Sequence, residues 1–278
     1  MSLVNVSSTS RKLCQLYKHL RSHFGYAHPW WPGEPLEVAV TAILVQQCDW
    51  SAAWKAVLRL REHELLSLPA LAGAKSAVVQ SCIQGVAFGP TKAKRLIGFA
   101  RAVLDDGYVR IEAFLSRQRD IGRLRSDLLA FPGIGAETAD SMMLFASEHP
   151  CFVIDAYTRR IMARLGLFPE LDQSFWLRQS YRRLQDFFEE NLLLDFSLYD
   201  DLPFANGVPR PVALFRDFHA QLVELGKHHC LKTGPRCLAV GRRGWTNYAL
   251  CEPHCLTTAC QRCPLAGCCR TARRPEVV

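Results

Sequence analysis

Apolar residues recur at helical spacing through most of the chain. An apolar stripe at positions i, i+3, i+4, i+7 and i+11 predicts an amphipathic first helix, and it consists of Leu13, Leu16, Tyr17, Leu20 and Phe24. Prolines at 29, 32 and 35 then interrupt the pattern. Further helices are predicted over residues 35–48, 51–63, 91–106, 154–166, 173–193 and 211–229. No segment longer than a few residues alternates as a strand would, so the pattern predicts an all-α fold.

Local residues indicate where some of these helices begin and end. Ser51 and Thr91 are predicted N-caps, because a hydroxyl oxygen can accept a hydrogen bond from a free amide of the first helical turn. Gly107 is the predicted stop of the helix over 91–106, since glycine favours the conformation that ends a helix.

A turn with two glycines, residues 132–135, separates two segments with helical spacing of apolar residues. Apolar residues up to Phe131 lead to Pro132 and then to Gly133-Ile134-Gly135, after which residues 139–146 resume the helical spacing. Glycines allow positive φ and a close approach of the backbone to a ligand, and the following helix offers amide groups to an anion such as a phosphate. The turn predicts a DNA-binding helix-hairpin-helix, although the four residues alone also fit an ordinary helical hairpin.

The hairpin and the carboxylate twenty residues beyond it resemble the endonuclease III-type DNA glycosylases. In this resemblance Gly133, Ile134 and Gly135 form the DNA-binding hairpin, and Asp155 takes the position of the catalytic aspartate. Bifunctional members carry a lysine two residues after the second glycine, which forms a Schiff base with the sugar; here that catalytic position holds Glu137. Because a carboxylate cannot form an imine, the resemblance implies a glycosylase without lyase activity.

Two segments upstream of the hairpin, Trp30-Trp31-Pro32 and residues 45–48, resemble the endonuclease III-related 3-methyladenine glycosylases in particular. This resemblance implies that Gln46 fills the space left by an extruded nucleotide, and that a base pocket is formed by Trp30, Trp31, Pro32, Trp50 and Lys227. Alone, the tryptophans fit core packing equally well, and Lys227 fits a solvated charge near a helix end. Val45, Gln47 and Cys48 depart from the family pattern of threonine, asparagine and threonine, which leaves the substrate base open.

Composition, read without the family, agrees with a nucleic-acid partner. The chain has 34 Lys and Arg against 26 Asp and Glu, a formal charge of +8. Arginines that can neutralise phosphates precede the hairpin, namely Arg95, Arg101, Arg110, Arg117, Arg119, Arg123 and Arg125. Charge alone does not decide the partner, because many basic proteins bind no nucleic acid. The longest mostly apolar run, residues 38–45, is far shorter than the ~20 residues of a membrane span. We therefore expect an intracellular monomer that binds double-stranded DNA, nucleoid-associated if bacterial, and no membrane.

Eight of the 12 cysteines lie at or after residue 230, which favours metal ligation in a reducing compartment. The resemblance implies a 4Fe-4S cluster with cysteines spaced by six, two and five residues. These spacings occur, but 22 residues separate Cys237 from Cys260. The ligands are then Cys230, Cys263 and Cys269 together with either Cys237 or Cys260. Zinc is the alternative, in a site formed by the cysteines and histidine of residues 251–263. With either a cluster or zinc, we expect the metal to hold a loop whose arginines lie along DNA, namely Arg236, Arg242, Arg243, Arg262 and Arg270.

The family architecture implies two helical domains with the active site in the cleft between them. Residues 34–149 fit a six-helix barrel domain that ends in the hairpin; residues 1–33 with 150–278 fit the second domain, with a cluster loop at 230–269. The function expected is a monofunctional base-excision glycosylase that releases alkylated purines. Two alternatives stay open. One is an endonuclease III-like enzyme for uracil, mispaired thymine or oxidised pyrimidines, with lyase activity from Lys92 or Lys94. The other is a non-catalytic iron-sulfur DNA-binding protein.

Overall fold

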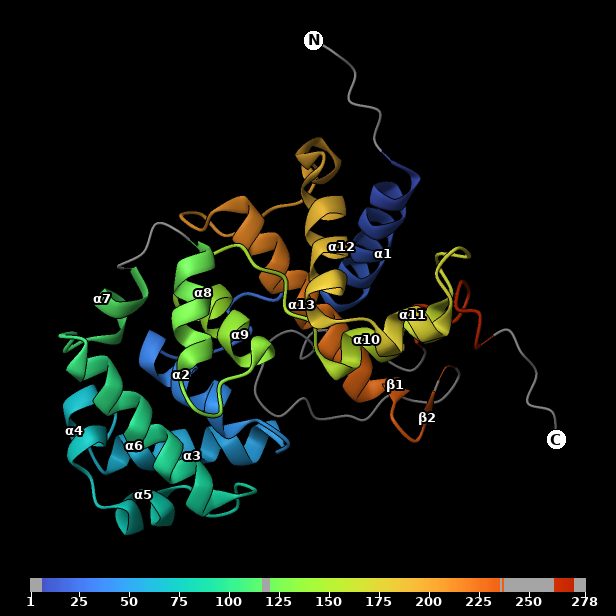
Figure 1. Cartoon of the computed structure of the whole chain (residues 1–278). Helices are drawn as coiled ribbons and strands as arrows, with labels where there is room; N and C mark the ends of the chain where they lie inside the picture. The colour runs from blue at the N-terminus through green and yellow to red at the C-terminus, as the bar shows by residue number, and fades with distance from the viewer. Residues whose placement is uncertain (1–6, 117–120, 236, 238–262, 273–278) are drawn as a thin grey trace. The chain divides into compact units, whose positions relative to one another are not determined.

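A computed structural model describes residues 7–116, 121–235, 237 and 263–272. The fold is almost entirely helical (Figure 1), in agreement with the all-α prediction. The chain divides into two compact units, one formed by Met1–Trp30 with Cys151–Val278 and the other by Trp31–Pro150. None of the described helices is long and apolar enough to span a membrane.

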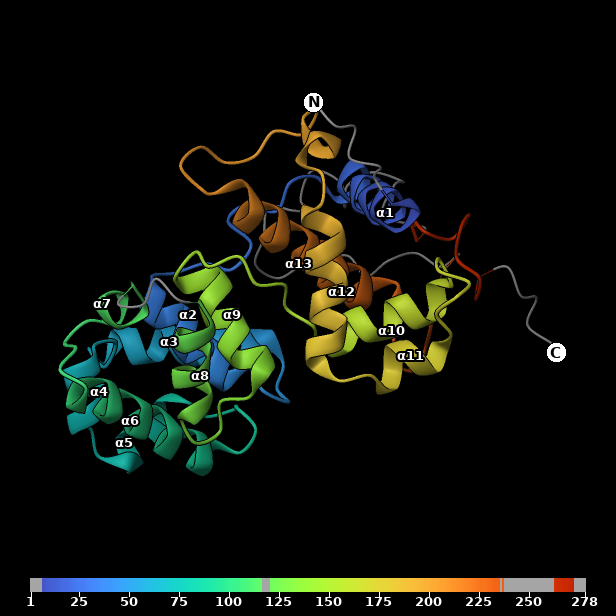
Figure 2. The same ribbon diagram turned by 45° about the horizontal axis from the view of Figure 1, so that its top comes forward.

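The unit of residues 31–150 is built around a buried helix, α2 (Pro35–Leu44), in which every residue after Pro35 is buried. Apolar residues on all sides of α2 explain this position, and the helix contacts α3, α6, α7 and α9. The described part of this unit contains eight helices, three of them only six or seven residues long. The others are α3 (Trp50–Glu62), α4 (Leu68–Gly73), α5 (Ser76–Cys82), α6 (Gly89–Asp105), α7 (Ile111–Ser116), α8 (Ile121–Ala130) and α9 (Ala136–Ala146). Figure 2 shows them from a second side.

The other unit is organised around α13 (Arg210–His228), which contacts α1 and α10. Its core contains stacked and edge-on phenylalanines, including Phe152 and Phe188 with ring centroids 4.4 Å apart. The remaining elements are α1 (Ser8–Phe24), α10 (Ala156–Leu165), α11 (Gln173–Arg178), α12 (Tyr181–Leu193), the 3-10 helix η1 (Phe196–Tyr199) and the short strands β1 (Cys230–Leu231) and β2 (Gly234–Pro235). The two strands pair antiparallel, with Cys230 opposite Pro235.

Several predicted helix ends are wrong, for local reasons. Asp49, not Ser51, caps α3, because its carboxylate accepts the Ser51 amide at 2.8 Å. Thr91 lies inside the first turn of α6, which begins at Gly89. The helix expected over 35–48 ends at Leu44, and the one expected over 173–193 is two helices, the second capped by Ser180. Gly107 does follow the end of α6, with φ 88°.

Candidate functional site

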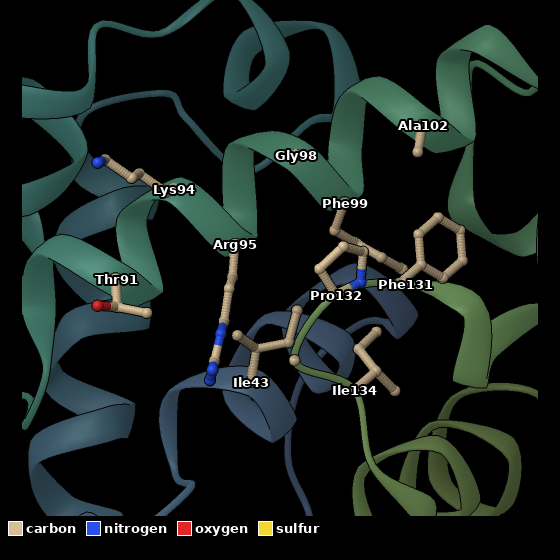
Figure 3. A pocket seen from close by; sticks show the side chains of 11 residues that line it. Ile43, Thr91, Lys94, Arg95, Gly98, Phe99, Ala102, Phe131, Pro132 and Ile134 are labelled. Carbon is tan, nitrogen blue, oxygen red and sulfur yellow. The ribbon is translucent and has the colours of Figure 1, made fainter.

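The turn between α8 and α9 holds the predicted hairpin residues. Gly133 has φ 85°, whereas Gly135 has φ −95° and is the N-cap of α9, so only the first glycine uses the left-handed region. Ile134 is buried and donates its amide to Phe131 O at 3.1 Å. The side chain of Arg95, from α6, lies against Gly133, where any Cβ would collide with its guanidinium (Figure 3). The positive φ therefore favours glycine at residue 133, and a Cβ there would also displace the Arg95 side chain.

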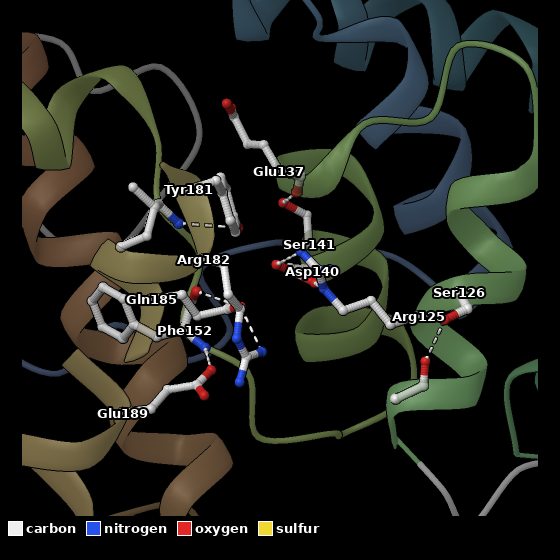
Figure 4. A network of polar contacts seen from close by, with 12 residues as sticks. Arg125, Ser126, Glu137, Asp140, Ser141, Phe152, Tyr181, Arg182, Gln185 and Glu189 are labelled. Carbon is white, nitrogen blue, oxygen red and sulfur yellow. Dashed lines mark hydrogen bonds and ion pairs between the residues drawn. The ribbon is translucent and has the colours of Figure 1, made fainter. Parts of the chain in front are cut away.

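A bidentate ion pair joins the two helices of the hairpin (Figure 4). Arg125 on α8 donates from Nε to Asp140 Oδ1 at 2.7 Å and from Nη2 to Oδ2 at 3.2 Å. Asp140 on α9 is fully buried, so the pair fixes the angle between the helices that carry the turn. Glu137, in the first turn of α9, is exposed and extends away from this pair.

Gln46 lies in the turn after α2 and is tied to the hairpin. Its Nε2 donates to Gly133 O and to Thr138 Oγ1, both at 2.9 Å, and its Oε1 accepts from Arg95 Nη1 at 3.0 Å. The structure thus brings Gln46 to the predicted DNA-binding turn, where its side chain helps to shape the loop.

Lys92 binds the backbone of the turn that holds Gln46. Its Nζ donates to Leu44 O and Gln46 O, both at 2.7 Å, and the residue is only 1% exposed. Burial lowers the pKa of this amine. Because Nζ is held inside the protein by two carbonyl oxygens, Lys92 is poorly placed to attack a sugar. Lys94, two residues later, is exposed.

Two of the predicted pocket tryptophans lie together in the unit of residues 31–150. The rings of Trp31 and Trp50 meet edge to face with centroids 5.0 Å apart. The ring centroid of Phe145 lies 5.1 Å from that of Trp31, and the ring of Trp54 is parallel to that of Trp50 with centroids 6.3 Å apart. Pro32, which follows Trp31 in the sequence, is half-buried. Trp31 and Trp50 are likewise half-buried, so this aromatic cluster is not closed core.

Asp155 belongs to the other unit and is the N-cap of α10. Its Oδ1 accepts the Thr158 amide at 2.7 Å, and the residue is 6% exposed. The hydrogen bond to the first turn of α10 holds this carboxylate in one orientation. Capping and catalysis are compatible, because the cap uses one carboxylate oxygen.

Trp30 and Lys227 lie in the same unit as Asp155. Trp30 Nε1 donates to Glu224 Oε1 at 2.8 Å, and Lys227 Nζ lies 3.5 Å from the same oxygen and 5.8 Å from the centre of the Trp30 ring. The rings of His219 and Trp30 are nearly perpendicular, with centroids 5.7 Å apart. Burial lowers the pKa of His219, and the Asp155 carboxylate offsets part of that shift.

Four of the candidate metal ligands line one small cavity at the end of α10. These are Cys230, Cys237, Cys263 and Cys269, with Ile161, Leu165 and Leu265 among the apolar residues around them. Burial raises the pKa of the Cys237 thiol, and raises that of Cys263 to about 12. In both cases the neighbouring cysteines contribute to the increase.

Within the described ranges, no group of three or more His, Cys, Asp or Glu side chains is arranged to hold one metal ion. Cys260 and the alternative zinc ligands Cys251, His254 and Cys255 lie outside the described residues, as do Arg117, Arg119, Arg236, Arg242, Arg243 and Arg262.

Sequence analysis missed several residues of these sites. Arg95 was counted only as a phosphate-binding charge, and Glu224 was not considered. Trp54 follows Trp50 by one helical turn, a spacing that could have revealed it. Phe88 is 64% exposed with φ 58° immediately before α6, a strained and exposed aromatic that the apolar pattern does not indicate.

Comparison with known proteins places this geometry in a family. Residues 40–183 match the HhH-GPD superfamily of base excision DNA repair proteins. The chain is 31% identical over 219 residues to the predicted DNA repair glycosylase MJ1434 of Methanocaldococcus jannaschii, covering 78% of this chain and 88% of that protein.

Two solved structures share the fold. One is the H. pylori 3-methyladenine DNA glycosylase MagIII bound to 1,N6-ethenoadenine, with a TM-score of 0.65 and 24% identity over 77% of this chain and 95% of that one. The other is a trapped endonuclease III–DNA covalent intermediate, with a TM-score of 0.64 and 17% identity over 95% of this chain and 96% of that one. The chain belongs to the HhH-GPD superfamily of base excision DNA repair proteins and is a DNA N-glycosylase.

Proposed function

We propose that this glycosylase is monofunctional and releases alkylated purine bases from double-stranded DNA, with Asp155 as the catalytic carboxylate. The observation that carries the proposal is the buried, N-capping Asp155, in the same unit as Trp30 and Lys227. The substrate class is supported by the likeness to MagIII, whose bound ligand is a modified purine.

The chemistry follows from the charge that develops as the glycosidic bond breaks. Positive charge grows on the sugar, and a fixed carboxylate stabilises it most when water is excluded. The target base must first leave the helix stack, which costs a few kcal/mol. Gln46 and the hairpin turn are the residues proposed to hold the distorted DNA. A methylated purine that carries a positive charge is already a good leaving group, so the site needs no strong acid.

Absence of a lyase step rests on Glu137. The position that would carry the attacking lysine holds an exposed carboxylate, and Lys92 is buried under the Gln46 turn. Base release should therefore precede any strand break. Borohydride trapping is the direct test: a covalent adduct between the unmodified protein and DNA would show that a lysine reaches the sugar.

A 4Fe-4S cluster is the cofactor proposed for the C-terminal cysteines. The gathering of Cys230, Cys237, Cys263 and Cys269 around one cavity supports this proposal, because cysteine thiolates are the usual ligands of such clusters. A bound cluster would link the C-terminal segment to the end of α10. A backbone hydrogen bond from Arg270 N to Leu165 O already joins the two. Iron analysis at about four atoms per chain would support this cofactor, and stoichiometric zinc would replace it.

Substrate choice is tested with duplexes that each contain one damaged base. We expect release of 3-methyladenine to exceed release of uracil or thymine glycol, scored before and after alkali. Efficient excision of uracil or thymine glycol, with alkylated purines ignored, would keep the Asp155 mechanism and overturn the substrate. No release of any base from the panel would instead favour a protein that binds DNA without catalysis.

A further inference from the structure

Glu224 is a buried carboxylate that the mechanism above does not use. It lies on α13, is 2% exposed, and contacts three groups. Its Oε1 accepts from Trp30 Nε1 at 2.8 Å and lies 3.5 Å from Lys227 Nζ, while its Oε2 lies 3.7 Å from His228 Nε2. A carboxylate buried this deeply is normally paired, and here the pairing joins two of the proposed pocket residues.

The position of Lys227 creates an electrostatic problem for a cationic base. Its ammonium lies 5.8 Å from the centre of the Trp30 ring, so it already occupies the electron-rich face that would attract a charged purine. An uncompensated ammonium there would repel such a base. Glu224 cancels that charge and, through the indole N–H, fixes the ring orientation.

We infer that Glu224 sets the charge preference of the base pocket: it positions Trp30 and neutralises Lys227, so that cationic purines are accepted. This inference rests on the proposed function, since it needs Trp30 and Lys227 to line the base pocket. Glu224 acts through its neighbours and is a positioning residue. Burial raises the pKa of its carboxyl, and Lys227 and the Trp30 N–H offset only part of this increase.

The test separates the charge of Glu224 from its hydrogen bond. Glu224→Gln keeps an oxygen that accepts from Trp30 but removes the negative charge. Values of kcat and KM are measured at about pH 8, above the pKa of an unperturbed histidine, on duplexes with a cationic base (7-methylguanine) or a neutral one (1,N6-ethenoadenine). We expect kcat/KM for the cationic base to fall at least about tenfold, and that for the neutral base to change less than about threefold.

Lys227→Met in the Glu224→Gln background is the decisive second variant. Removing the ammonium should restore the cationic-to-neutral ratio to within about threefold of the unmodified protein. Glu189→Gln is the matched control, because Glu189 is a carboxylate of the same unit that accepts the Phe152 amide at 2.8 Å; its ratio should not change.

The outcomes distinguish the inference from the proposed function. Equal losses on both bases in Glu224→Gln, or no rescue by Lys227→Met, would reduce Glu224 to a structural residue and overturn the inference alone. An unmodified protein that releases neither purine would overturn the proposed substrate and the inference with it.

Discussion

Replacing Asp155 by Asn tests the catalytic assignment with little change to the fold. Asparagine caps helices about as well as aspartate, so the Thr158 amide keeps its partner. Stability should fall by only about 0.3–1 kcal/mol, the share of the lost charge at the helix N-terminus. The lost charge should matter far more to the reaction. A unit charge about 4 Å from the developing cation is worth about 4 kcal/mol at an effective dielectric of about 20, or roughly a thousandfold in rate.

The assay is single-turnover base release under saturating enzyme, with DNA affinity and thermal unfolding measured on the same samples. Asp155→Ala should lose similar activity but also destabilise the protein further by about 1–3 kcal/mol, because the buried Thr158 amide loses its partner. Asp172→Asn is the matched control, since Asp172 caps α11 through the Phe175 amide at 2.7 Å. Activity of Asp155→Asn within about tenfold of the unmodified protein would refute the electrostatic argument.

Three further outcomes are expected. Gly133→Ala should weaken DNA binding and cost about 1–3 kcal/mol in unfolding experiments, because its φ is 85° and the added carbon meets a guanidinium. Gly135→Ala, at φ −95° with open space around the new carbon, should have a smaller effect on both, since only the preference for glycine at the N-cap is lost. Trp50→Ala should cost about 1–3 kcal/mol in transition-state binding, measured as kcat/KM, with non-specific DNA affinity unchanged. Cys237→Ala should lose bound iron by elemental analysis while Cys260→Ala retains it; the reverse result would favour the other ligand set.

Glycine spacing made the hairpin predictable, because the constraint at Gly133 is local: a positive φ and a tight turn. The same locality misled the cap assignments. Asp49 precedes Ser51 by two residues, and the sequence pattern cannot tell which of the two oxygens reaches the free amide. The carboxylate at Asp155 was also visible, since it stands at the start of a clear helical pattern.

Long-range pairing explains what the sequence could not indicate. Trp30 and its partner Glu224 are separated by 194 residues, so no local spacing relates them. Trp30 and Trp31 are neighbours in sequence, but the boundary between the two compact units falls between them. The tryptophans predicted to form one pocket thus belong to two separate compact units.

The arginine count overstates the charge available to DNA. Arg125, which composition assigns to phosphate binding, is held in a bidentate pair with the buried Asp140, so its charge is compensated inside the hairpin. Arg95 donates to Gln46 and covers Gly133, and Arg101 donates to the carbonyl of Ala72 at 2.8 Å. These contacts shape the loops that approach DNA more than they neutralise it. We therefore expect the orientation of backbone groups at the hairpin to contribute more to DNA recognition than a net charge of +8 suggests, because phosphate contacts that fix register depend on geometry as well as on charge.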